Sequence, residues 1–90
     1  MTTTPVFVAW LARNDKGLRP IIRELRKGVI STDGVEHVFY LDATGAVTSV
    51  YESFETVFTT RREACRFLAA EVRREIELLK AEAAQLEVAL

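Results

Sequence analysis

The fold is decided at residues 57–64, which read Val57-Phe58-Thr59-Thr60-Arg61-Arg62-Glu63-Ala64. Thr60 and Glu63 have the spacing of a capping box, in which the threonine hydroxyl accepts a hydrogen bond from a first-turn amide and the glutamate reaches back to the cap amide. Neither Gly nor Pro interrupts the chain from Arg61 to Leu90, and Ala, Glu, Leu, Arg and Lys predominate there. The sequence therefore predicts one helix over residues 60–90, about 40–45 Å long at ~1.5 Å per residue.

Upstream of this boundary, short runs rich in β-branched and aromatic residues alternate with turn sequences. Residues 6–12, 35–41 and 46–51 are predicted strands. The turn sequences contain Asn, Asp and Gly, which tolerate the positive φ of tight hairpins. They are Asn14-Asp15-Lys16-Gly17, Thr32-Asp33-Gly34 and Asp42-Ala43-Thr44-Gly45.

Residues 18–31 fit two interpretations. Their apolar side chains have helical spacing, and Gly28 could end a helix. Against a helix, Arg19 is a poor N-cap and the segment lies between two hairpin turns. A strand is favoured, and a helix over residues 18–27 remains the alternative.

These elements predict a single α+β domain over residues 1–90. A four-stranded antiparallel meander over residues 5–52, which could curl toward an SH3-like half barrel, precedes the C-terminal helix. Such a sheet normally buries one face. On the third strand the more apolar set is expected to face inward: Val35, His37, Phe39 and Leu41.

Two apolar stripes follow the predicted helix. The first, which could close over the sheet, consists of Ala64, Phe67, Leu68 and Val72. The second recurs at alternating spacings of three and four, as the a and d positions of a heptad repeat do, and predicts a homodimer. Its members, called the seam below, are Ala69, Val72, Ile76, Leu79, Ala83, Leu86 and Leu90. In a parallel pair Glu75 would attract Lys80 but Glu82 would repel Glu87, so the charges leave parallel and antiparallel pairing open.

The sequence favours no enzyme, cofactor or metal. The chain has one histidine, His37, and one cysteine, Cys65, which are too few ligands for a zinc site within one chain. No flanking motif supports a Cys–His nucleophile pair. The four glycines are isolated, so no phosphate loop is predicted. No catalytic residue is therefore assigned.

Location follows from similar arguments. A single cysteine cannot form an intrachain disulfide, which favours a reducing compartment and hence the cytoplasm. No apolar run approaches the length of a membrane span, and residues 1–5 lack the basic start of a signal peptide.

Charge is unevenly distributed although the formal net charge is −1. Residues 31–60 contain acidic side chains but no Lys or Arg, and an acidic sheet edge can occupy a cationic groove on another protein. The predicted partner-binding residues are Glu36, Asp42, Glu52 and Glu55. Residues 13–27 are basic, and beside Trp10 they form an alternative nucleic-acid surface. That surface would use Arg19, Arg23, Arg26 and Lys27, together with Arg13.

The segment from Gly45 to Ala64, a turn and strand followed by the aromatic, spaced threonine and Glu-Ala of residues 57–64, resembles small proteins encoded by bacteriophages and other mobile elements. The resemblance covers residues 35–90 and brings no catalytic residues with it. Some such proteins inhibit host defence, including anti-CRISPR proteins. The resemblance implies a non-enzymatic inhibitor or adaptor that binds a larger host protein, and a small nucleic-acid-binding regulator is the alternative.

Overall fold

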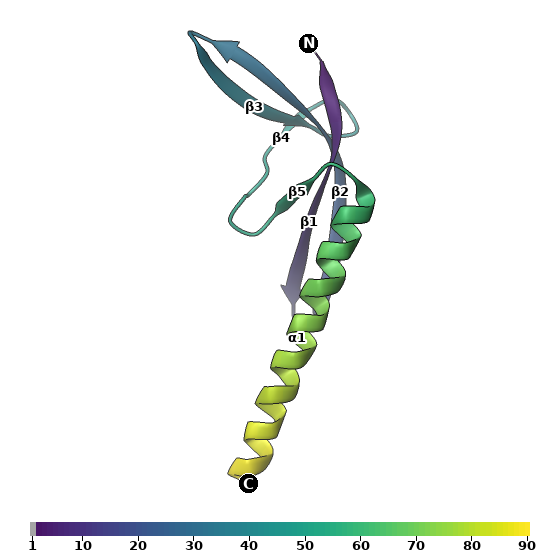
Figure 1. The fold of residues 1–90 in the computed structure, drawn as a ribbon, viewed down its shortest axis with the longest axis vertical. Coiled ribbons are helices and arrows are strands. Elements are labelled where there is room, and N and C mark those ends of the chain that lie inside the picture. Colours follow the sequence, from purple (N-terminus) through teal and green to yellow (C-terminus); the bar gives the residue numbers. More distant parts are fainter. Residues whose placement is uncertain (1) are drawn as a thin grey trace.

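Two long strands form the centre of the sheet (Figure 1). The computed structural model describes residues 2–90. Strand β1 (Thr3–Asn14) pairs antiparallel with β2 (Gly17–Thr32), from Thr3 opposite Gly28 to Asn14 opposite Gly17. The predicted turn joins them, because Asn14 Oδ1 accepts from the Lys16 amide at 2.8 Å and Gly17 takes φ 116°.

The ambiguous segment is therefore a strand throughout, and no helix forms over residues 18–27. Its apolar side chains serve both faces of the sheet. Leu25 belongs to an apolar cluster on one face, and Ile22 packs into a second cluster with the helix. The apolar residues of this segment have helical spacing because the central part of the strand is buried on both faces.

The remaining strands flank this pair. β3 (Val35–Leu41) follows the predicted hairpin turn, in which Asp33 and Gly34 have φ of 52° and 78°. The strand predicted over 46–51 is only β4 (Val47–Thr48), and an unpredicted β5 (Thr56–Phe58) pairs with β1. Within residues 2–90 the sheet has five strands in the order β4-β3-β2-β1-β5. It is open, with β4 and β5 at opposite edges, and forms no half barrel.

Helix α1 (Arg61–Ala89) packs on one face of β1, β2 and β5. The threonine half of the predicted capping box is confirmed, because Thr60 Oγ1 accepts a hydrogen bond from the Glu63 amide at 3.2 Å. Three of the four residues of the first predicted stripe pack on the sheet as expected: Ala64 and Leu68 are buried against Ala9 of β1, and Phe67 packs beside them. The fourth, Val72, is half-buried beside β2. The opposite face carries the cluster of Val6, Val8 and Leu25.

The predicted inner face of β3 is wrong. Val35 and His37 are exposed, whereas Tyr40, from the other face, packs against the Val6–Val8–Leu25 cluster. The β2–β3 hairpin extends away from α1, as Figure 1 shows, so no helix covers the face on which Val35 and His37 lie.

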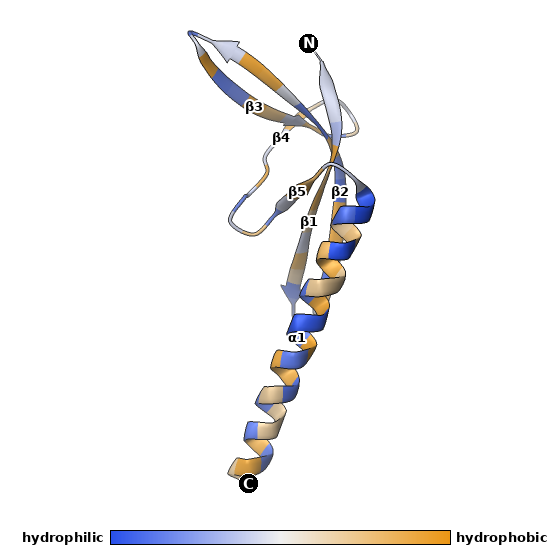
Figure 2. Cartoon of the chain, in the orientation of Figure 1, coloured by the Kyte–Doolittle hydropathy of each residue, from blue (hydrophilic) through white to orange (hydrophobic). Residues whose placement is uncertain are grey.

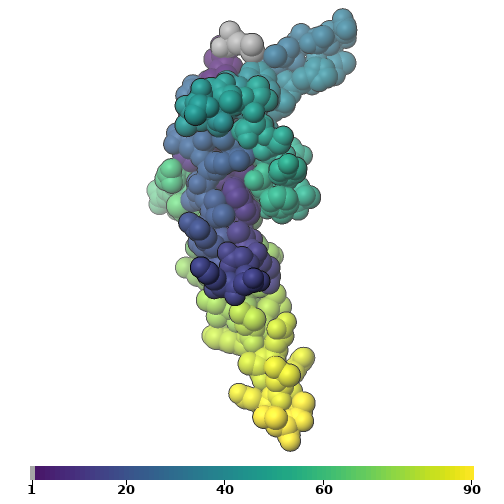
Figure 3. Space-filling view, turned by 180° about the vertical axis from the view of Figure 1, so that it is seen from behind, coloured from purple at the N-terminus to yellow at the C-terminus, as the bar shows by residue number. Residues whose placement is uncertain are grey.

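The molecule is long and thin. Its radius of gyration is 17.8 Å and its extents are 63 × 25 × 22 Å, whereas a compact chain of this length has a radius of gyration of about 12 Å. Figure 3 shows the β2–β3 hairpin at one end and the C-terminal turns of α1 at the other. The helix in residues 61–89 lacks the apolar content that crossing a membrane requires.

Gly28 supports a prediction about packing. A Cβ at this position would lie 2.8 Å or less from three atoms of the Phe39 ring, which covers the glycine from the neighbouring strand. Gly28→Ala should destabilise the fold by about 1–2 kcal/mol in urea unfolding, because the ring must move. In a Phe39→Ala background the same change should cost nothing. An equal cost in both backgrounds would contradict this packing.

Candidate interaction surfaces

The seam of α1 is exposed. Ile76, Leu79 and Leu86 have exposed fractions of 45%, 55% and 70%, and Leu90 at the C-terminus is fully exposed. Figure 2 shows apolar residues continuing along α1 well past the end of the sheet. From Ile76 onward every residue of α1 is exposed. The chain itself therefore leaves this stripe uncovered.

The seam and the buried stripe of α1 point in different directions. At about 100° per residue, the seam is centred roughly 70° around the helix from Ala64, Leu68 and Glu75. The sheet packs against the stripe that contains Ala64, Leu68 and Glu75. The seam instead lies on the side of the helix next to β2. Pairing of the seam with another helix would therefore leave the contact between helix and sheet intact.

An apolar groove lies beside the first two residues of the seam, Ala69 and Val72. It has a volume of about 500 Å³ and lies between β2 and α1. Pro20 and Ile22 form its β2 side, and Ala69 and Val72 of the seam form its helix side. The groove and the seam are one continuous apolar surface.

Two of the predicted acidic contact residues have structural roles. Asp42 Oδ1 accepts from the amides of Thr44 and Ala46 at 2.8 and 3.1 Å, which closes the turn after β3. The hydrogen bonds from the Thr44 hydroxyl and amide lower the pKa of the Asp42 carboxyl. Glu55, expected at the surface, is buried, with an exposed fraction of 6%. Its carboxylate accepts from the Tyr51 amide at 2.6 Å, so it stabilises the 51–55 turn and is not available as a surface contact.

The other two acidic residues are exposed on the sheet face opposite α1. Glu36 lies on this face of β3, and Glu52 lines a shallow groove there with Lys27 and Tyr40. Burial and, to a smaller extent, the charge of Glu52 raise the pKa of the Tyr40 phenol. Of the four predicted residues, Glu36 and Glu52 are exposed, Asp42 is half-buried and Glu55 is buried.

The predicted basic surface is divided between the two faces. Because side chains alternate along a strand, Arg19, Arg23 and Lys27 project opposite α1, whereas Arg26 projects on the helix side. Strand alternation, applied to residues 19–27, was the signal that could have shown this division.

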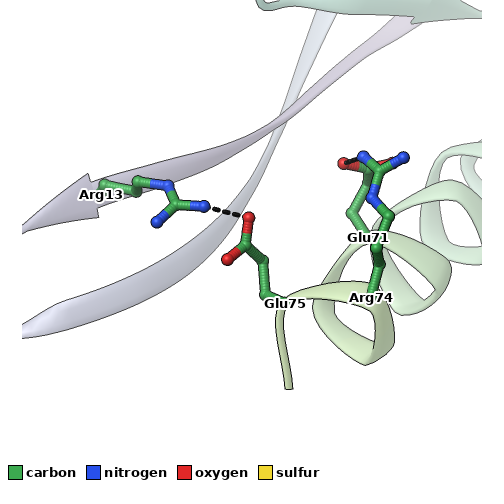
Figure 4. A network of polar contacts seen from close by, with 4 residues as sticks. All are labelled: Arg13, Glu71, Arg74 and Glu75. Carbon is green, nitrogen blue, oxygen red and sulfur yellow. Dashed lines mark hydrogen bonds and ion pairs between the residues drawn. The ribbon is translucent and has the colours of Figure 1, made fainter. Parts of the chain in front are cut away.

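Several of these cations are held within the chain. Arg23 Nη2 donates to the Ser49 carbonyl at 3.0 Å, and its guanidinium lies 6.0 Å from the centre of the Trp10 ring. Arg26 donates to the hydroxyl and carbonyl of Thr3 at 2.8 and 3.1 Å. Arg13 forms an ion pair with Glu75 of α1, shown in Figure 4 beside the Glu71–Arg74 pair.

The end of the β2–β3 hairpin is a surface that the sequence analysis missed. Apolar side chains are exposed on both of its faces: Val29 and Val38 on the face opposite α1, and Ile30 and Val35 on the other. The adjacent pairs Val29-Ile30 and Val38-Phe39 carried this signal, since neighbouring apolar residues on a strand point to opposite faces. We call residues 29–38 the distal hairpin.

His37 and Cys65 do not meet. His37 is on β3, whereas Cys65 lines the groove on α1, and α1 packs on β1, β2 and β5. Within residues 2–90 no group of His, Cys, Asp and Glu side chains could hold a metal ion.

Comparison with family models, curated proteins and solved structures finds no match to this chain.

Glu55 and Glu52 provide a test that separates structural from surface roles. Glu55→Ala removes the charged acceptor of the partly buried hydrogen bond from the Tyr51 amide and should destabilise the protein by about 1–3 kcal/mol in urea unfolding. Glu55→Gln, which retains an oxygen acceptor, should cost less. Glu52→Ala should change stability by less than about 0.5 kcal/mol. Equal losses for Glu55→Ala and Glu52→Ala would show that Glu55 is not the support of this turn.

Proposed function

We propose that this protein is a non-enzymatic protein-binding module, an inhibitor or adaptor that docks on a larger protein through the distal hairpin. The observation that carries the proposal is the exposure of apolar side chains on both faces of a projecting hairpin. Val29, Ile30, Val35 and Val38 have exposed fractions between 41% and 55%. Clustered exposed apolar side chains rimmed by polar residues are typical of protein interaction sites.

Charge indicates what kind of surface the partner presents. Residues 31–60 contain no Lys or Arg, so the distal hairpin and the loops beside it are acidic. Glu36 and Glu52 flank Val38 and Tyr40 on the face opposite α1. A partner with an apolar cleft between basic side chains fits this arrangement, because opposite potentials speed association and fix orientation.

The nucleic-acid alternative has weaker support. Binding a phosphate backbone requires several free cations on one face. Here Arg26 lies on the opposite face from Arg23, and both guanidinium groups donate hydrogen bonds within the chain. Residues 45–64 resemble small proteins encoded by phages, some of which inhibit host defence, and this resemblance agrees with a protein partner.

Capture from a bacterial lysate tests the proposal. The immobilised protein should retain a larger protein, identified by mass spectrometry, that elutes as salt is raised. Glu36→Lys with Glu52→Lys should reduce its retention about tenfold or more. Glu24→Lys reverses the charge of one exposed carboxylate on the other face of the sheet and should have little effect.

Two results would contradict the proposal. The first is retention of no protein, or equal retention by the Glu36→Lys/Glu52→Lys variant. The second is tight binding of DNA or RNA that Arg19→Glu with Lys27→Glu abolishes, which would support the regulator alternative instead.

A further inference from the structure

We infer that the seam of α1 is covered by a second copy of this chain, paired antiparallel so that Ile76 lies opposite the partner's Leu86. This inference concerns the other end of the molecule from the distal hairpin and does not depend on the proposed function. The seam is apolar over successive a and d positions. Ala69, Val72 and Leu79 line grooves beside β2 and the β1–β2 hairpin, and from Ile76 onward the seam residues are exposed. A helix with a heptad seam is matched best by another such helix.

The sizes of the seam residues favour antiparallel over parallel pairing. In a parallel pair each position meets itself, so Ala69 and Ala83 would form two thin layers of alanine against alanine. In the antiparallel pair a positions meet d positions. Ala83 then faces the partner's Leu79, and Val72 faces the partner's Leu90. Small residues opposite large ones give an evenly filled core.

The charges beside the seam agree with this register. In a parallel pair the attraction between Glu75 and Lys80 is weakened, because Glu75 is already paired with Arg13 of its own chain. The repulsion between Glu82 and Glu87 would remain. In the antiparallel register Arg73 faces the partner's Glu87, and symmetry provides this attraction twice. Like charges meet only near the centre, where Lys80 and Glu82 each face the same residue of the partner. The Lys80 charge is partly offset within its own helix, because its Nζ lies 3.4 Å from Glu77 Oε1.

A shift by one heptad is less favourable. It would place Ile76 opposite the partner's Leu79, bringing Arg73 against Lys80 and Glu75 against Glu82, each of them twice. The proposed register avoids these contacts. It overlaps residues 72–90 of the two helices over about 27 Å at ~1.5 Å per residue.

The arrangement leaves room for both sheets. The sheet covers α1 as far as Glu75, where Arg13 near the end of β1 makes its ion pair. One turn later Leu79 lines a groove with Leu18 of the β1–β2 hairpin, and the rest of the helix extends past the sheet. The two sheets therefore lie at opposite ends of the helix pair. Leu90 of each chain reaches Val72 at the end of the partner's apolar groove. The dimer therefore presents its two distal hairpins in opposite directions.

Light scattering tests the dimer on the intact chain. At about 100 µM the protein should have a mass of about 20 kDa, twice the 10.1 kDa of one chain. Leu79→Glu should give the monomer mass. Leu78→Glu is the matched control, because Leu78 is adjacent and similarly exposed, at 53% against 55%, but lies off the seam. It should leave the mass unchanged.

Charge reversal and a distance measurement test the direction. Glu87→Arg should weaken the antiparallel dimer about three- to tenfold at low salt, and adding Arg73→Glu should restore it. In a parallel dimer Glu87→Arg would instead strengthen association by meeting Glu82. Spin labels on Ala70→Cys, in a Cys65→Ser background, should be offset by about 33 Å along the axis. Parallel helices would place them at the same level.

Three results would overturn the inference. A monomer at about 100 µM would leave the seam to a different protein. A dimer that survives Leu79→Glu would be held by another surface. A dimer strengthened by Glu87→Arg, with labels at one level, would be parallel.

Discussion

The packing of Ala64 and Leu68 against Ala9 fixes how the two parts of this molecule are joined. Ala9 and Ala64 have no exposed surface, and their small side chains let α1 approach β1 closely. A larger side chain at either position would lift the helix from the sheet. Thr60 starts α1 directly after β5, so the helix runs beside β1 and passes the sheet where the β1–β2 hairpin turns. The length of α1 beyond this contact is what exposes the seam.

A fold of this shape buries little. Its two small apolar clusters lie on opposite faces of the same pair of strands, and the hairpin and the C-terminal turns of α1 extend from them at opposite ends. Chains of this size have limited core stability, so apolar surface at both ends favours binding to other molecules. In our account one end pairs two copies and the other end docks on a partner. The dimer would then be bivalent, which raises its avidity for a partner that has two accessible sites.

Local signals in the sequence predicted most of this architecture. The Thr60 cap, the three hairpin turns and the apolar stripe of the seam each depend on residues close together in the chain. The structure contains the cap and the turns, and it leaves the stripe exposed from Ile76 onward. Features that depend on distant parts of the chain were missed. β5 forms because residues 56–58 return to the edge of β1, and Glu55 is buried by an irregular turn. The prediction of which face of β3 points inward was wrong, because the hydrophobic pattern of a strand does not reveal where a helix stops covering the sheet.

Hydrogen exchange along α1 tests the central claim most directly, namely that the sheet anchors only the first half of the helix and a second copy covers the rest. Amides of residues 65–75 should be protected at every protein concentration. Amides of residues 78–87 should exchange rapidly in dilute protein, become protected as concentration rises, and lose that protection in the Leu79→Glu variant. Protection that is uniform along α1, and independent of both concentration and Leu79→Glu, would contradict the account.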